Sequence, residues 1–169
     1  MQDTATLTDL EPAESGDAVE AVPDAIVVRL GDARYAVAMA DVAEVVPVPA
    51  VTRVPGMPSW LAGVVNWRGH VLPLLDLRPL LGEPSSPLPT SARVVVLTRD
   101  GIEAGLVVEL VTGLLTPSEE QPLAAPSTAS TNAVDLVVGV VDAGGPVSLL
   151  DAGAVLELRR SLPPTRRTT

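Results

Sequence analysis

The feature that most constrains the fold is a segment of strand, corner and strand that occurs twice. Residues 60–81 contain an apolar run, a corner at residues 66–69 with the sequence Asn-Trp-Arg-Gly, and a second apolar run. Asp76 follows the second run, at the place where an N-cap residue would begin a short helix. Residues 139–151 repeat the order of residues 63–76 with one residue fewer at the corner. The sequence therefore predicts one structural unit that is used twice.

The composition favours short strands over helices. Hydrophobic residues make up 47% of the 169 residues, yet there is no Phe, so aliphatic side chains must form most of the core. The 13 Gly and 17 Pro indicate frequent turns. Apolar runs between these turns give about five strands in each half, and a sheet of that size can close into a small barrel without exposed edges. We predict an all-β fold of two five-stranded barrels side by side, with short helical segments.

Changes in composition divide the chain into a domain and two tails. Residues 1–24 are acidic and lack apolar periodicity, so we expect a disordered tail, and residues 159–169 are expected to form a flexible basic tail. The domain of residues 25–158 is expected to contain three parts in order: a first barrel at about 25–82, a second barrel at about 92–150 and a closing helix at about 151–158. Residues 117–134, rich in Ser, Thr, Ala and Pro, are predicted to form a long loop.

Charge and cysteine content exclude several classes of protein. A net charge of −10 argues against a surface that binds nucleic acid, because phosphate binding requires clustered cations. Cysteine is absent, so neither a disulfide framework nor thiolate chemistry is expected. The acidic start is unlike a secretory signal, and no apolar run approaches the length that inserts into a membrane. We therefore expect a cytoplasmic protein without direct membrane insertion.

The residues needed for catalysis are scarce. His70 is the only histidine, which excludes a metal site built from several histidines. Glu119 and Glu120 are neighbours in the predicted loop and are interpreted as solvated charges. Residues 142–146 lack the spacing and the lysine of a phosphate-binding loop and are interpreted as a hairpin turn. We expect no catalytic residues, no cofactor and no metal.

The first corner is the unusual feature that remains. Asn66, Trp67 and Gly69 are interpreted as structural corner residues, but the second copy of the unit has no Arg and no Trp at its corner. A guanidinium at a tight corner can bind a carboxylate bidentately and so fix the orientation of a surface, and Glu44 is the candidate partner of Arg68. The alternative is a solvated Arg68 beside a Trp67 that covers the mouth of a barrel. The residues alone leave both interpretations open.

Residues 63–78 carry a resemblance to a known family. Their sequence, Gly-Val-Val-Asn-Trp-Arg-Gly-His-Val-Leu-Pro-Leu-Leu-Asp-Leu-Arg, resembles the central motif of CheW, the coupling protein of bacterial chemotaxis. The similarity extends upstream through Tyr35 and residues 51–55 and covers roughly residues 25–158. It implies two five-stranded, SH3-like barrels. It also implies a non-catalytic adaptor that links transmembrane chemoreceptors, the methyl-accepting chemotaxis proteins, to the regulatory domain of a histidine kinase.

The resemblance also implies which residues contact the partners. By position, Val42, Glu44 and Arg68 are expected to contact the helical tip of the receptor, in a groove between the barrels. Val51 and Gly63 are tied more loosely to partner or kinase binding. The protein would lie in the cytoplasm and be recruited to membrane-bound receptor arrays. A related coupling module in another pathway, such as twitching motility or a kinase-associated regulator, is the alternative.

Overall fold

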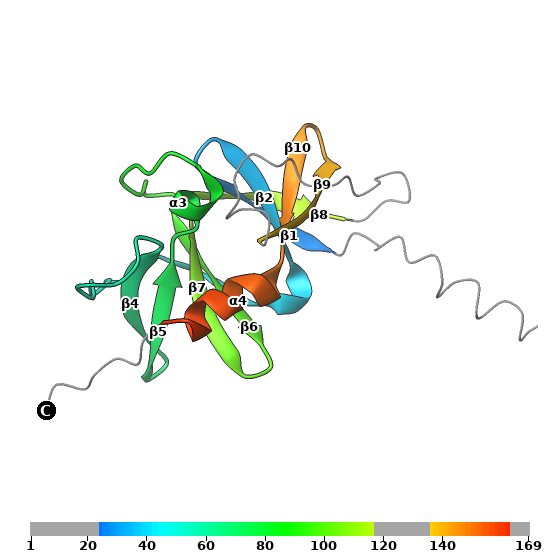
Figure 1. Ribbon diagram of the computed structural model, residues 1–169. Helices are drawn as coiled ribbons and strands as arrows, with labels where there is room; N and C mark the ends of the chain where they lie inside the picture. The colour runs from blue at the N-terminus through cyan, green and yellow to red at the C-terminus, as the bar shows by residue number, and fades with distance from the viewer. Residues whose placement is uncertain (1–23, 117–135, 163–169) are drawn as a thin grey trace, which may run out of the picture.

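A computed structural model describes residues 24–116 and 136–162 of the chain (Figure 1). The strands among these residues are β1 Ala25–Leu30, β2 Ala33–Ala38, β3 Val42–Pro47, β4 Leu61–Trp67, β5 His70–Leu75, β6 Arg93–Arg99, β7 Ile102–Val108, β8 Leu110–Leu115, β9 Val137–Asp142 and β10 Pro146–Leu150. The helical segments are the 3-10 turn η1 Met39–Asp41 and the α-helices α3 Arg78–Leu81 and α4 Ala152–Arg160.

The predicted ends of the domain can be compared with the structure only in part. The closing helix expected at about 151–158 is α4, and it continues through the first two residues of the expected basic tail before ending at Ser161. Apart from its last residue, the acidic tail predicted for residues 1–24 lies outside the described residues. The loop predicted for residues 117–134 and the remainder of the basic tail also lie outside them.

Two five-stranded sheets account for all ten strands, which confirms the predicted fold class. Sheet A has the order β8-β1-β2-β10-β9, and sheet B has the order β3-β6-β7-β5-β4. Along sheet B, two reciprocal backbone hydrogen bonds of 2.9 Å join Thr52, which follows β3, to Val64 of β4 at the opposite edge. The two edges of sheet B therefore meet, as they do in a small barrel.

The prediction that residues 25–82 form one barrel and residues 92–150 the other is wrong. Sheet A combines β1 and β2 of the first half with β8, β9 and β10 of the second, and sheet B combines the remaining strands in the same way. The exchange depends on two parallel pairings, β10 with β2 and β5 with β7. Parallel strands cannot be joined by a tight turn, so their partners are distant in sequence and leave no local signal. The chain changes sheet at η1 and again at Glu109.

The predicted repeat is confirmed by the strand registers. Asn66 pairs with Val71 across the first corner, and Asp142 pairs with Pro146 across the second. When the two copies are aligned, the four residues 67–70 therefore correspond to the three residues 143–145. Both hairpins also contain a bulge at the same place, opposite the last two residues of β5 and of β10. The two halves are thus the same unit in detail, shortened by one residue at the second corner.

The structure has a central apolar core and one core within each sheet, and β1 contributes to two of these three cores. This explains why β1 is buried along nearly its whole length. Alternate side chains of β1 point to opposite faces, so Ile26, Val28 and Leu30 join a central core while Ala25 and Val27 join the core of sheet A. The central core also takes residues from β5, β6, β7, β10 and α4 and therefore lies between the two sheets. Burying each large aliphatic side chain contributes roughly 1.5–3 kcal/mol. The sheets are consequently packed together by a core that both of them share.

Candidate functional site

The first corner is a tight turn of two residues. Trp67 and His70 form the last pair of the β4–β5 ladder, and Arg68 and Gly69 between them have φ angles of 46° and 83°. Two positive φ angles are the signature of a type I′ hairpin turn, in which Asn-Gly or Asp-Gly is preferred. The Gly69 amide donates a 3.1 Å hydrogen bond to Asn66 Oδ1. The side chain of Asn66 therefore bonds across the turn, and Gly69 supplies its second positive φ angle.

Arg68 contacts the partner that the sequence proposed. Its Nη2 donates to Glu44 Oε2 at 2.5 Å, and its Cζ lies 4.9 Å from the centroid of the Trp67 ring. The side chain of Arg68 is 71% exposed and that of Glu44 is 37% exposed. Trp67 itself packs against the core of sheet B, which agrees with a tryptophan that covers the barrel. Trp67 therefore supports the fold, and Arg68 contacts Glu44 through Nη2 and Oε2 rather than through the bidentate pair that the sequence suggested. A role of Arg68 in binding remains a prediction.

The backbone of Arg68 is in a conformation that its side chain disfavours. For residues other than glycine, left-handed backbone geometry costs roughly 1–2 kcal/mol. The second corner has Gly144 at the corresponding place, with φ 68°, and the same turn between β6 and β7 is made by Asp100 and Gly101. The fold therefore accepts better-suited residues in this turn. The identity of Arg68 is explained by its side chain rather than by the turn.

The strand β3 presents the other predicted contact residues. Glu44 lies beside Arg68, and Val42 precedes it on the same strand, half-buried against the central core. In the ladder with β6, Val42 pairs with Leu97 and Glu44 pairs with Val96, which leaves Ala43 as the extra residue of a bulge. The structure thus brings Glu44 and Arg68 together directly and places Val42 two residues away across the bulge.

Val51 and Gly63 are in contact with each other, and the structure gives Gly63 a packing role. Gly63 has φ 150°, and a Cβ atom built on it would lie 2.5 Å from Val51 Cγ1 and 2.6 Å from the Thr52 carbonyl oxygen. Any side chain at this position would separate the strand edges that Thr52 and Val64 join. Val51, by contrast, is 37% exposed at the edge of a pocket of about 610 Å³. The prediction that these two residues bind a partner remains a prediction.

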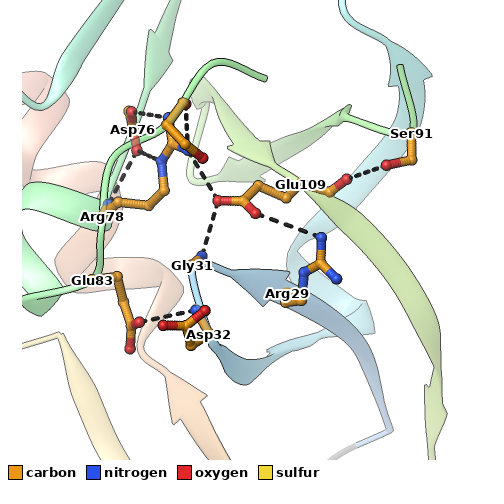
Figure 2. Close-up of polar contacts among 9 residues, drawn as sticks. Arg29, Gly31, Asp32, Asp76, Arg78, Glu83, Ser91 and Glu109 are labelled. Atoms are coloured by element: carbon orange, nitrogen blue, oxygen red, sulfur yellow. Dashed lines mark hydrogen bonds and ion pairs between the residues drawn. The ribbon is translucent and has the colours of Figure 1, made fainter. Parts of the chain in front are cut away.

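A cluster of buried charges was not found by sequence reasoning. We define the Arg78 cluster as Asp76, Arg78 and Glu109, with Arg29 and Gly31 at its edge (Figure 2). Arg78 Nη1 donates to Glu109 Oε1 at 2.9 Å, and its Nη2 and Nε donate to the Asp76 carboxylate at 2.9 and 3.0 Å. Glu109 Oε1 also accepts the Gly31 amide at 3.0 Å. The cluster joins β1 and β2 of sheet A to the end of β5 in sheet B at the point where the chain changes sheet.

The sequence singled out Asp76 from this cluster and did not identify Glu109. Asp76 was expected to cap a helix, but the N-cap residue of α3 is Leu77, and Asp76 Oδ1 instead accepts the backbone amide and the Nε of Arg78. The hydrogen bond to Asp76 raises the pKa of Arg78 against the opposing effect of burial, so the guanidinium stays charged. Glu109 is 31 residues from Arg78, and only the exchange of strands brings the two together.

A second cluster lies at the other change of sheet. We define the Arg99 cluster as Asp41, Arg99, Asp151 and Gly153. Arg99 binds the Asp41 carboxylate through Nε at 2.9 Å and Nη2 at 2.8 Å, and its Nη1 lies 3.9 Å from Asp151 Oδ1. Asp41 is 8% exposed. Each change of sheet is therefore accompanied by a buried carboxylate that is paired with an arginine.

Neither a metal-binding group nor a membrane-spanning helix is found among the described residues. No group of three or more His, Asp or Glu side chains within them is placed to hold a metal ion. His70 lies 2.8 Å from Glu103, with both side chains well exposed. None of the helices in the described part of the chain is long and apolar enough to cross a membrane. The distinctive surface feature is instead the oriented Glu44–Arg68 pair.

The fold places the chain among all-β proteins built of two five-stranded sheets. The comparison with known families narrows this class: the description "CheW-like domain" matches residues 24–160. This match covers most of the chain, and the chain belongs to the CheW-like family. It is accordingly a coupling adaptor of chemosensory signalling, as the resemblance implied.

The chain is similar to proteins with three different names in three bacteria. The chain is 28% identical to chemotaxis protein CheW of Bacillus subtilis over 80% of its own length and 88% of that protein. It is 40% identical to protein PilI of Pseudomonas aeruginosa over 51% of its own length, and the match spans 48% of PilI. It is 32% identical to protein FrzA of Myxococcus xanthus over 78% of its own length and 84% of that protein.

A solved structure supports the fold. The scaffolding protein TtCheW from Thermoanaerobacter tengcongensis superimposes with a TM-score of 0.68 at 24% identity, covering 76% of this chain and 84% of that one. At this level of identity the likeness concerns the fold alone. It agrees with the two five-stranded sheets described above.

Proposed function

We propose that this chain is a non-catalytic adaptor that binds the cytoplasmic tip of a chemoreceptor and the regulatory domain of a histidine kinase at the same time. The observation that carries the proposal is the Glu44–Arg68 pair, held on a turn that would be better served by another residue. A conformational cost without benefit to the fold is typical of a residue that serves binding. The receptor tip would contact Val42, Glu44 and Arg68, in a groove between the barrels.

The two kinds of contact on this surface have different roles. Val42 and the exposed Val45 offer apolar surface to an amphipathic receptor helix, and the charged pair beside them fixes its orientation. Affinity then comes mainly from packing, while register and association rate come from charge. The kinase regulatory domain would bind a barrel surface away from this corner, and the edge formed by Val51 and Gly63 is a candidate for that contact. The adaptor would work in the cytoplasm, at membrane-bound receptor arrays.

A second pathway is supported by a specific comparison. Over the residues that match, the identity to PilI is 40%, higher than the 28% to CheW of Bacillus subtilis, although the PilI match covers about half of each chain. The same adaptor chemistry would serve a chemosensory pathway other than flagellar chemotaxis, such as twitching motility. The two assignments differ in which receptor and kinase are bound and leave the proposed contacts unchanged.

The test is a three-component assembly of the full chain, a recombinant receptor tip and a kinase regulatory domain, the last two taken from the same genome. Arg68→Glu places a like charge beside Glu44 and should weaken receptor binding at least about 30-fold, because juxtaposed like charges in an interface cost several kcal/mol. Kinase binding and the melting temperature should stay near those of the wild type. Arg160→Glu is the matched control, because Arg160 is also exposed and paired with a glutamate, but on α4.

The possible outcomes test different parts of the proposal. Equal loss of receptor and kinase binding would show that Arg68 supports the fold rather than one interface. A wild-type chain that binds neither partner would overturn the coupling function. Binding only to the receptor and kinase encoded beside pilus genes would select the second pathway.

A further inference from the structure

We propose that the Arg99 cluster positions β3 for binding, so that Asp41, Arg99 and Gly153 are positioning residues for Val42 and Glu44. The inference rests on the proposed function, because it concerns the same contact strand. None of these positioning residues is assigned a direct contact with the receptor.

The first argument is the geometry around Asp41. Asp41 is the last residue of η1 and is followed directly by β3, and both of its carboxylate oxygens are bound by Arg99. Two parallel hydrogen bonds between a guanidinium and a carboxylate fix orientation as well as distance. The pKa of Arg99 is raised, chiefly by the hydrogen bond to Asp41. The start of β3 is therefore attached to the end of β6 by a rigid pair of charges.

The second argument is the bulge that follows. Ala43 is the extra residue between the paired Val42 and Glu44, so the ladder with β6 is interrupted between the two predicted contact residues. A bulge bends and twists its strand, and the ladder alone fixes its neighbours less firmly. Asp41 holds the strand on one side of this bulge, and the Glu44–Arg68 pair holds it on the other. A change in the Arg99 cluster should consequently shift Val42 relative to Glu44.

The third argument is the helix α4, which leaves room for Arg99. Asp151 caps this helix, since its Oδ1 accepts the amides of Gly153 and Ala154 at 2.9 and 3.3 Å. A Cβ atom at Gly153 would lie 2.5 Å from Arg99 Nη1. A cation near a helix N-terminus opposes the helix dipole, so this arrangement does not serve the helix. Glycine at this position admits the guanidinium that binds Asp41.

These contacts suggest a substitution that disturbs the positioning and spares the fold. Gly153→Ala should favour the helix, because alanine has the higher helix propensity. The new methyl group would lie 2.5 Å from Arg99 Nη1 and 3.1 Å from Asp151 Oδ1, so one of these side-chain ends must shift. Because Nη1 belongs to the same rigid guanidinium as the Nε and Nη2 that bind Asp41, we expect its displacement to weaken both bonds to Asp41. We expect an unchanged or raised melting temperature, faster amide hydrogen exchange at Val42 and Glu44, and receptor binding weakened about 2- to 30-fold, the range for indirect coupling.

A matched control and a second variant make the test specific. Gly113→Ala is the control, since Gly113 has open space where its Cβ would lie and belongs to β8 of the other sheet. Arg99→Met removes the guanidinium and should weaken receptor binding by itself. Adding Gly153→Ala to Arg99→Met should then cause no further loss, because there is no guanidinium left to displace.

The outcomes distinguish this inference from the function on which it rests. A wild-type chain that fails to bind the receptor tip would overturn the proposed function. If the wild type binds and both Gly153→Ala and Arg99→Met bind equally well with unchanged exchange at Val42 and Glu44, the positioning role is overturned. If Gly153→Ala lowers the melting temperature, the comparison rests on Arg99→Met with and without Gly153→Ala. Additive losses in that comparison would likewise overturn the role.

Discussion

The two corners of the repeat have the same strand registers and different residues. At the first, Arg68 has a positive φ angle and pairs with Glu44, whereas at the second Gly144 occupies the corresponding place. The strands that occupy equivalent places in the two copies also differ: Glu44 is the first paired residue after the bulge of β3, and Gly113 is the first paired residue after the bulge of β8. The fold needs the turn but not the ion pair, so a feature present in one copy only is the better guide to binding.

The Arg78 and Arg99 clusters, in contrast to the corners, are a feature that both copies share. Both copies have a buried carboxylate where the chain changes sheet, Asp41 in one and Glu109 in the other, and both bind it with an arginine. The two arginines differ in exposure, 6% for the side chain of Arg78 and 44% for that of Arg99. A feature that both copies share serves the exchange of strands, although the Arg99 cluster also lies directly before the predicted contact strand.

The largest expected effect on stability comes from removing the more deeply buried of the two arginines. Arg78→Met removes the guanidinium that pairs with both Asp76 and Glu109 and leaves Glu109 only the more distant Arg29, so we expect a loss of about 3–5 kcal/mol in the free energy of unfolding. Arg99→Met should cost less, because it leaves one buried carboxylate, Asp41, without its guanidinium, and the exposed side of Arg99 is already solvated. Urea unfolding of both variants measures the two losses. Equal losses would show that exposure does not distinguish the clusters.

Placing arginine at the second corner should lower stability without improving binding. Gly144→Arg places a side chain at a φ angle of 68° and should lower the free energy of unfolding by about 1–2 kcal/mol. It should add nothing to receptor binding, since Gly113, the residue equivalent to Glu44 in the second copy, has no carboxylate to orient a guanidinium. Thermal unfolding and receptor titration check both statements. A gain in receptor affinity would mean that the second corner also faces the receptor.

The reverse exchange should separate stability from binding. Arg68→Gly relieves the backbone and loses an exposed ion pair, and these effects nearly cancel, so stability should remain within about 1 kcal/mol of the wild type. Receptor binding should fall, because the oriented charge is lost. Thermal unfolding and receptor titration measure the two effects. A markedly less stable variant would show that Arg68 is needed for the fold.

The smallest effect is expected for the ion pair itself. Arg68 and Glu44 are both exposed, so a double-mutant cycle of Arg68→Ala and Glu44→Ala should give a coupling of at most about 1 kcal/mol in stability. The same cycle measured on receptor affinity should show the larger coupling. Zero coupling in both measurements would remove the pair from the binding surface.

The sequence predicted what depends on neighbours in the chain. The hairpins, the repeated unit and the turn at Gly69 follow from local patterns of apolar and turn residues, and the Glu44–Arg68 contact followed from asking which carboxylate could serve an unexplained guanidinium. The family resemblance supplied the roles of these residues. The local patterns could not predict which sheet each hairpin would join.

What the sequence did not predict depends on the exchange of strands. Glu109 lies between two apolar strands and looks like a surface turn residue, yet it is 7% exposed because the parallel pairing of β5 with β7 brings Arg78 beside it. Gly153 likewise looks like an ordinary residue at the start of a helix. Its importance depends on an arginine that reaches it from the end of β6.

The exchange of strands also says something about how such a chain could have originated. Each half of the repeat contributes one hairpin to one sheet and three strands to the other, so a single half contains neither sheet in full. Two separate copies of a half-length chain could form the same pairings between them that the fused chain forms within itself. Such an assembly of two half-length chains would be an intertwined homodimer. Gene duplication and fusion would have turned its subunit interface into the central core, after which one corner was free to acquire Arg68 while the other kept glycine.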